Sequence, residues 1–101
     1  MKKKAPQRNA VLVTLRQIKP LLGEKYGVTK LGIFGSVARN EATECSDVDV
    51  VMETSRPNLL LSVHIKDTLE EALKVSVDLV QYREKMNPYL KARIDKDAVY
   101  V

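Results

Sequence analysis

Hydrophobic residues recur at every third or fourth position near the start of the chain, and this spacing predicts a helix over residues 7–25. Its apolar side consists of Val11, Leu12, Leu15, Ile18, Leu22 and Tyr26. Pro20 lies inside the pattern and lacks the N–H of an i→i−4 bond, so we expect it to kink the helix or to split it in two. Gly27 is expected to end the helix.

Beyond Gly27, short apolar runs alternate with longer amphipathic ones. The short runs predict strands at residues 30–34, 48–53 and 75–81 and an extended end at residues 98–101. The longer runs predict a brief helix from Ser36, as its cap, to about Glu41, a helix from Asn58 or Pro57 to Leu73, and a last helix over residues 88–96. The apolar face of the long helix is predicted to comprise Leu59, Leu60, Val63, Leu69 and Leu73. Alternating helices and strands predict an α/β (α+β) domain with a short mixed sheet flanked by helices.

Length and composition agree with a single small domain. A chain of 101 residues buries about two-thirds of its unfolded surface, so residues 1–101 are expected to form one domain without a separate substrate domain. Hydrophobic residues make up 45% and charged residues 30%, which is typical of a soluble globular protein.

The formal net charge of +4 favours anionic partners such as nucleotides. Three lysines follow Met1, and we expect residues 1–6 to form a flexible basic tail. No recognition helix, zinc motif or aromatic-interleaved basic run is present, so nucleic-acid binding is not expected. The single cysteine, Cys45, excludes an intramolecular disulfide, and no signal sequence or membrane span is visible. These features favour a cytoplasmic protein with no membrane association.

Three aspartates occur where apolar strand residues would be expected. Asp47 and Asp49 stand at the head of a valine-rich strand, and residues two apart on a strand share a face. Asp78 interrupts another apolar strand and could face the same place if the two strands are neighbours. Carboxylates held together repel one another unless a cation lies between them, and such hard oxygen ligands suit Mg²⁺. Three carboxylates could hold two ions, as in two-metal phosphoryl-transfer sites.

The pair Gly35-Ser36 follows one predicted strand and precedes the brief helix. Its backbone N–H groups and the Ser36 hydroxyl could hold a phosphate there, and Gly35 has no Cβ to keep the phosphate away. Phosphate donors beside metal-binding carboxylates predict a site for a metal–triphosphate complex.

The same residues resemble the signature of a known family. Gly35-Ser36, ten intervening residues and then Asp47-Val48-Asp49 resemble the motif of the DNA polymerase beta-like nucleotidyltransferases. The fuller string over residues 34–39 is similar to the minimal nucleotidyltransferases, and the resemblance extends over nearly the whole chain. It implies the polymerase beta-like fold and transfer of a nucleotide from a nucleoside triphosphate, ATP above all, with release of pyrophosphate.

The resemblance also implies roles for the motif residues. Asp47 and Asp49 would ligate both of two Mg²⁺ ions. Asp78 would ligate the ion that activates the acceptor hydroxyl, and could also receive the proton of that hydroxyl. Gly35 and Ser36 would hold the β- and γ-phosphates.

The motif assigns no single role to two residues that follow the Gly-Ser pair, Arg39 and Asn40. Arg39 is a candidate to contact a phosphate, although it could equally brace Glu41 or Glu44. Asn40 stands where the family more often has glycine, and asparagine tolerates the positive φ of such a loop.

Minimal members of the family resemble MntA-like antitoxins, which are paired with a HEPN-domain toxin. The resemblance therefore implies adenylylation of a hydroxyl on the HEPN partner. Two alternatives remain open, namely an antitoxin that acts by direct binding and a transferase for a small molecule. The acceptor, the nucleotide and the homo- or hetero-oligomeric state are left open.

Other reactive side chains have simpler interpretations. His64 has no second ligand at metal-binding spacing, and Cys45 has no activating neighbour in the sequence. Tyr82, Tyr89 and Tyr100 are interpreted as packing residues.

Overall fold

The computed structural model describes residues 5–101. The predicted basic tail lies mostly outside the described residues, and its last two members, Ala5 and Pro6, have no regular secondary structure. No helix within the described range combines the length and apolar character needed to cross a bilayer.

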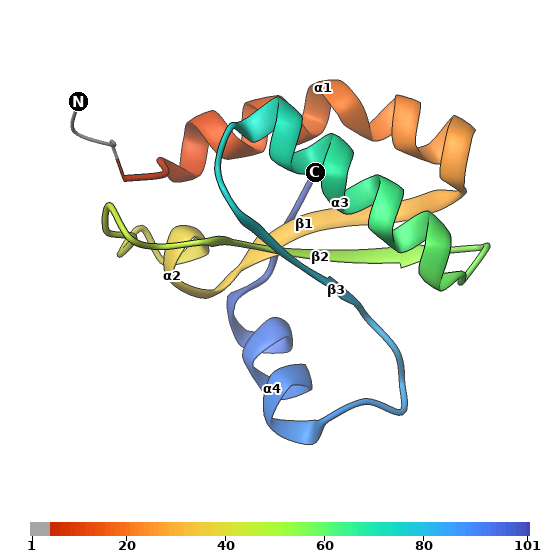
Figure 1. The fold of residues 1–101 in the computed structure, drawn as a ribbon. Helices are drawn as coiled ribbons and strands as arrows, with labels where there is room; N and C mark the ends of the chain where they lie inside the picture. Colours follow the sequence, from red (N-terminus) through yellow and green to blue (C-terminus); the bar gives the residue numbers. More distant parts are fainter. Residues whose placement is uncertain (1–4) are drawn as a thin grey trace.

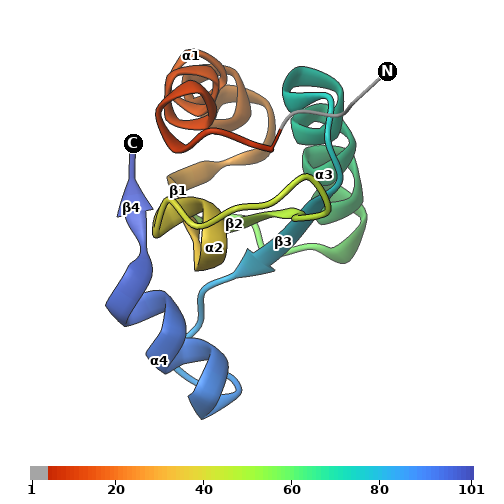
Figure 2. The same ribbon diagram turned by 90° about the vertical axis from the view of Figure 1, so that its left-hand side faces the viewer.

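The described residues form four helices and four strands around one mixed sheet. In chain order they are α1 (Arg8–Tyr26), β1 (Val28–Phe34), α2 (Gly35–Ala38), β2 (Val48–Thr54), α3 (Leu59–Leu73), β3 (Val77–Gln81), α4 (Pro88–Asp97) and β4 (Val99–Tyr100). The strand order is β3-β2-β1-β4, with β2 and β3 parallel and the other pairs antiparallel. Helices α1 and α3 cover one face of the sheet, and α4 lies on the other (Figures 1 and 2). The predicted fold class is confirmed.

The first helix runs without interruption past its proline. α1 spans Arg8–Tyr26 with Pro20 inside it, so the predicted alternative of two short helices is wrong. Leu15 and Leu22 are fully buried on either side of Pro20, and this packing holds the helix together despite one missing backbone bond. Gly27 ends the helix as predicted, with a φ of 73° and an N–H that donates to the Gly23 carbonyl at 3.0 Å.

Asparagines cap α3 and α4, whereas Ser36 does not cap α2. The prediction that Ser36 caps a brief helix over residues 36–41 is wrong, because the chain already turns at Gly35, with a φ of 72°, and α2 ends at Ala38. The Asn58 side chain accepts hydrogen bonds from two backbone N–H groups at the start of α3, and Asn87 does the same for α4.

The predicted apolar face of α3 is correct only in its second half. Leu69 and Ile65 are buried, and Leu73 is partly buried against the same core. The first-half residues are exposed, with 84% of Leu59, 65% of Leu60 and 50% of Val63 accessible to solvent. The positions of α3 that pack against the core recur every four residues from Ile65 onwards. Leu59, Leu60 and Val63 do not belong to this series.

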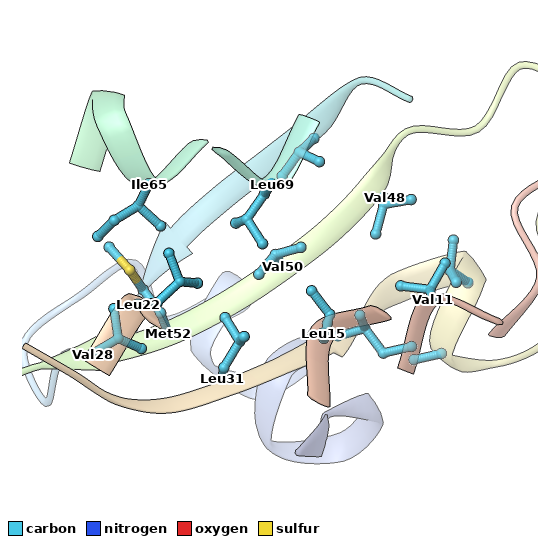
Figure 3. Close-up of a cluster of buried hydrophobic side chains, with 14 residues drawn as sticks. Val11, Leu15, Leu22, Val28, Leu31, Val48, Val50, Met52, Ile65 and Leu69 are labelled. Carbon is cyan, nitrogen blue, oxygen red and sulfur yellow. The ribbon is translucent and has the colours of Figure 1, made fainter. Parts of the chain in front are cut away.

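The two faces of β2 belong to different clusters. Val48, Val50 and Met52 are buried in the main core, where they lie toward Ile65 and Leu69 of α3 and toward α1 (Figure 3). The intervening Val51 belongs to a second cluster with Phe34 and with Ile94 of α4. Because successive strand residues point to opposite faces, Asp49 faces the α4 side together with Val51.

Candidate active site

Asp49 and Asp78 lie side by side on neighbouring parallel strands. The pairing register places Asp49 of β2 opposite Asp78 of β3. Adjacent strands are about 4.8 Å apart, and residues in register present their side chains on the same face. Two residues further along β3, Val80 packs against the α4-side cluster, so Asp78 shares that face. The structure therefore brings together two carboxylates that are far apart in the sequence.

Asp47 lies just before β2 at the edge of this group. Its loop is held by a hydrogen bond of 2.9 Å from the Thr43 N–H to the Ser46 hydroxyl and by one of 3.0 Å from the Ser46 N–H to the Thr43 carbonyl. Asp47 also borders a pocket of about 220 Å³ with Ser46 and Lys74, and neither Asp49 nor Asp78 lines that pocket. Asp47 is thus the most peripheral of the three predicted carboxylates.

The carboxylates act on one another electrostatically. Partial burial raises the pKa of Asp49 above its ordinary value, and the negative charges of Asp78 and, more weakly, of Asp47 raise it further. Arg93 and Arg39 oppose this rise, with Arg93 having the larger effect. A partly buried carboxylate surrounded by others is stabilised in its charged form when a cation binds.

The Asp49–Asp78 pair suits magnesium better than an ion that needs a complete protein cage. No three His, Cys, Asp or Glu side chains in residues 5–101 are arranged to hold a metal ion by themselves. Mg²⁺ is usually bound through one or two carboxylates together with waters and substrate phosphates. Two adjacent carboxylates on one face meet that requirement, whereas binding of two ions stays a prediction.

Gly35 lies directly against the Asp49 carboxylate. Phe34 pairs with Asp49 across β1 and β2, so the Gly-Ser pair begins where the carboxylates are. Gly35 is buried, and a Cβ at this position would overlap Oδ2 of Asp49. Both halves of the sequence motif therefore meet in one place. The roles of Gly35 and Ser36 toward phosphate stay predictions.

Arg39 is held between two carboxylates. Its Nε donates to Glu41 at 3.3 Å, and its Nη1 donates to Asp97 of α4 at 2.7 Å. These hydrogen bonds raise the pKa of the guanidinium, with Asp97 as the main cause. Of the two braces considered from the sequence, the structure contains the one to Glu41, and residues 5–101 show no ion pair between Arg39 and Glu44. The prediction that Arg39 contacts a phosphate remains untested.

Two charged residues of α4 escaped the sequence analysis. Asp97 anchors Arg39, and Arg93 influences the pKa of Asp49. The sequence offered one signal, since Arg93 directly precedes the apolar Ile94 that anchors α4. That signal is informative only once α4 is known to cover the face that carries the aspartates.

The remaining candidate side chains either make structural contacts or are exposed to solvent. His64 stacks on Tyr26 with ring centroids 6.5 Å apart, and the Tyr82 hydroxyl donates to Asp95 at 2.9 Å. The prediction that Tyr89 is a packing residue is wrong, because it is 83% exposed in the first turn of α4, and Tyr100 is also exposed, at 44%.

Comparison with known proteins gives a consistent result. The family model described as "Nucleotidyltransferase domain" matches residues 15–101. "Putative protein adenylyltransferase MJ0128" of Methanocaldococcus jannaschii is 44% identical over 88 residues, covering 86% of this chain and 90% of that protein. "Protein adenylyltransferase MntA" of Thermococcus cleftensis is 33% identical over 98 residues, covering 89% and 98%.

Solved structures share the fold. A structure described as a "putative minimal nucleotidyltransferase" superposes with a TM-score of 0.76 at 29% identity, covering 92% of this chain and 94% of that one. A Shewanella oneidensis complex, "tri-AMPylated … HEPN toxin in complex with MNT antitoxin", contains a chain with a TM-score of 0.65 at 18% identity, covering 89% and 70%. The family match, the relatives and the meeting of the Gly-Ser and Asp-x-Asp segments lead to one conclusion: this chain belongs to the nucleotidyltransferase domain family, as one of its minimal members, and is a nucleotidyltransferase.

Proposed function

We propose that this chain transfers AMP from Mg²⁺–ATP to a hydroxyl group on a HEPN-domain partner protein and thereby acts as its antitoxin. The observation that carries the proposal is the register of Asp49 and Asp78 on parallel strands, with Gly35 packed against Asp49. This arrangement supplies metal-binding carboxylates and a close backbone approach in one place. A cytoplasmic location belongs to the same proposal.

The three aspartates would hold the magnesium. Asp49 and Asp78 are the principal ligands in this proposal, and Asp47 joins them from the start of β2. Bound magnesium would neutralise charge on the phosphates and lower the pKa of the acceptor hydroxyl. The triphosphate would approach the backbone at Gly35, next to the Asp49 carboxylate, and the Ser36 hydroxyl would donate to a phosphate oxygen.

The transfer itself is an in-line displacement. The acceptor oxygen forms a bond to the α-phosphorus, and the bond from that phosphorus to the oxygen bridging to the β-phosphate breaks. The electron pair of the broken bond leaves with pyrophosphate. The proton of the acceptor hydroxyl passes to the Asp78 carboxylate, which is exposed at the surface and can release it to water.

The architecture supports a large acceptor. β3 is an edge strand of the sheet, so Asp78 lies at the border of the domain and not in an enclosed pocket. The curated relatives are named protein adenylyltransferases, and a chain of the same fold occurs in complex with an AMPylated HEPN toxin. A protein surface could approach the open side of the site.

A transfer assay tests the proposal directly. The chain is incubated with Mg²⁺, ATP labelled at the α-phosphate and the product of the neighbouring gene, which this proposal predicts to be a HEPN-domain protein. We expect label on the HEPN protein, and a loss of about 100-fold or more in rate for Asp49→Asn and Asp78→Asn. Asp67→Asn, which changes an exposed carboxylate on α3, is the matched control and should retain the rate.

Labelling that survives in both aspartate variants would contradict the proposed site. Toxin inhibition that persists in Asp47→Ala, Asp49→Ala and Asp78→Ala, without labelling of the toxin, would instead identify an antitoxin that acts by binding. Label on a small hydroxylated compound in the absence of any partner would identify a small-molecule transferase.

A further inference from the structure

We propose that Arg93 of α4 is a phosphate-contacting residue of this site, and that its guanidinium binds the triphosphate tail of the nucleotide. This inference rests on the proposed nucleotide site and extends it. It assigns to α4 a direct part in substrate binding that the sequence motif does not contain.

The contacts of α4 show which of its flanks faces the site. On one flank, Lys91 lies over the ring of Tyr82 at 5.9 Å, and Asp95 accepts a hydrogen bond of 2.9 Å from the Tyr82 hydroxyl. That flank faces the chain beyond the end of β3. On the other flank, Asp97 accepts a hydrogen bond of 2.7 Å from Arg39, just past α2.

Arg93 belongs to the flank that faces α2. Residues four apart on a helix are neighbours on its surface, so Arg93 lies one turn before Asp97 on the same side. α2 begins at Gly35, which touches Asp49. Arg93 also directly precedes Ile94, which is fully buried against Phe34 and Val51. Its side chain therefore starts at the border between α4 and the face of the sheet that carries the carboxylates.

The electrostatic effect of Arg93 on Asp49 agrees with this placement, and Arg93 has no competing partner. Both Arg93 and Arg39 lower the pKa of Asp49 through their positive charge, and Arg93 has the larger effect. Arg93 is nevertheless exposed, and within residues 5–101 it forms no ion pair and no side-chain hydrogen bond. Arg39, by contrast, already donates to two carboxylates.

The chemistry of the site favours a cationic side chain in addition to the metal. A triphosphate that approaches Asp49 and Asp78 meets negative charge, and the carboxylates themselves are occupied with the metal. A guanidinium offers a planar pair of donors that matches two phosphate oxygens and keeps its charge at every physiological pH. An exposed arginine at the border of the carboxylate face can bind the phosphates without breaking an existing ion pair.

Calorimetric titration with a non-hydrolysable triphosphate tests the inference. Wild type, Arg93→Gln and Arg93→Lys are titrated with the β,γ-imido analogue of ATP, and separately with AMP, in the presence of Mg²⁺. We expect Arg93→Gln to weaken triphosphate binding by about 10-fold or more, Arg93→Lys to weaken it less, and AMP binding to change less than triphosphate binding.

Lys96→Gln is the matched control, because it removes one exposed positive charge from the same helix, and it should change the dissociation constant by less than about twofold. Triphosphate binding by Arg93→Gln that equals wild type would overturn the inference. If Asp49→Asn abolishes magnesium-dependent binding in that case, the proposed function stands without Arg93. Failure of wild type to bind the Mg²⁺–triphosphate would overturn both.

Discussion

Gly35 and Asp49 constrain each other at the level of single residues. The backbone of Gly35 has a φ of 72°, a conformation that side-chain-bearing residues rarely adopt, and its missing Cβ leaves the space that the Asp49 carboxylate occupies. The glycine of the Gly-Ser motif therefore has two functions. It permits the turn into α2, and it leaves room for the carboxylate of a proposed metal ligand.

The first prediction concerns this contact. Gly35→Ala should destabilise the protein by about 1 kcal/mol or more, because of the positive φ, and should displace the Asp49 carboxylate so that transfer activity is lost. Urea unfolding and the labelled-ATP assay measure the two effects.

Gly27→Ala provides the control for strain. Gly27 has a φ of 73°, and a Cβ there would lie 2.8 Å from the Ser55 hydroxyl, far from the carboxylates. This variant should lose stability by the same mechanism but retain activity at temperatures where it is folded. Equal retention of activity by Gly35→Ala would show that the Asp49 contact is not needed.

The second prediction concerns the charge of Asp49. Its pKa in the folded protein is raised above the ordinary value of 3.8, chiefly by burial and then by Asp78, so the folded state favours the protonated form. The stabilisation that Asp49 contributes is therefore present at low pH and is lost as the pH rises through the raised pKa. Without metal, Asp49→Asn should have a higher melting temperature than wild type at about pH 7, and the difference should shrink as the pH falls toward about 4.

Thermal unfolding in the presence of a chelator measures this difference across the pH range. Asp67→Asn, an exposed change on α3, should show no such pH-dependent gain. A melting temperature of Asp49→Asn at or below wild type at neutral pH would show that the carboxylates do not destabilise one another.

At the level of secondary-structure elements, hydrophobic spacing predicted the order of the helices and strands and most of their bounds. Hydrophobic spacing did not predict burial correctly where no neighbouring element packs against an apolar residue. Leu59, Leu60 and Val63 fit a helical apolar pattern, yet the sheet and α1 contact α3 only along the stripe that contains Ile65 and Leu69. Sequence periodicity shows that a residue could be buried, whereas the contact depends on where the neighbouring elements end.

The third prediction separates these two kinds of leucine. Leu69 is fully buried, so Leu69→Ala should lower the free energy of unfolding by about 2–5 kcal/mol. Leu60 is 65% exposed, so Leu60→Ala should change it by about 0.5 kcal/mol or less. Urea denaturation of both variants measures the contrast, and equal losses would mean that the first turns of α3 are buried in solution.

At the level of the whole molecule, the motif and the strand pattern singled out three candidate carboxylates, and the topology explains why two of them meet. Asp49 and Asp78 come together because α3 connects two parallel strands in register, which the alternation of elements suggested. The position of α4 could not be predicted, because its apolar residues fit either face of the sheet. The Arg39–Asp97 hydrogen bond and the proximity of Arg93 to the site both depend on that position.

The fourth prediction concerns stabilisation by bound ligand. The proposed magnesium ligands Asp49 and Asp78 lie on two strands, so the complete site exists only in the folded state. A ligand that binds only the folded state stabilises it by about 2.7 kcal/mol at 100 times its dissociation constant. Mg²⁺ together with the non-hydrolysable triphosphate should therefore raise the melting temperature of wild type, whereas a chelator should abolish the rise. Asp78→Asn should show a smaller rise in differential scanning fluorimetry. A rise of the same size without magnesium would contradict metal-dependent binding.

The alternation along β2 has a consequence for how this domain can change. Val48, Val50 and Met52 point into the main core, whereas Asp49 points to the α4 side of the sheet, where the proposed site lies. Substitutions at the inward positions alter hydrophobic packing, whereas substitutions at Asp49 alter the proposed site and, through its burial and charge, the stability as well. Heat tolerance can therefore be tuned through the inward side chains of β2 without replacing a residue of the proposed site.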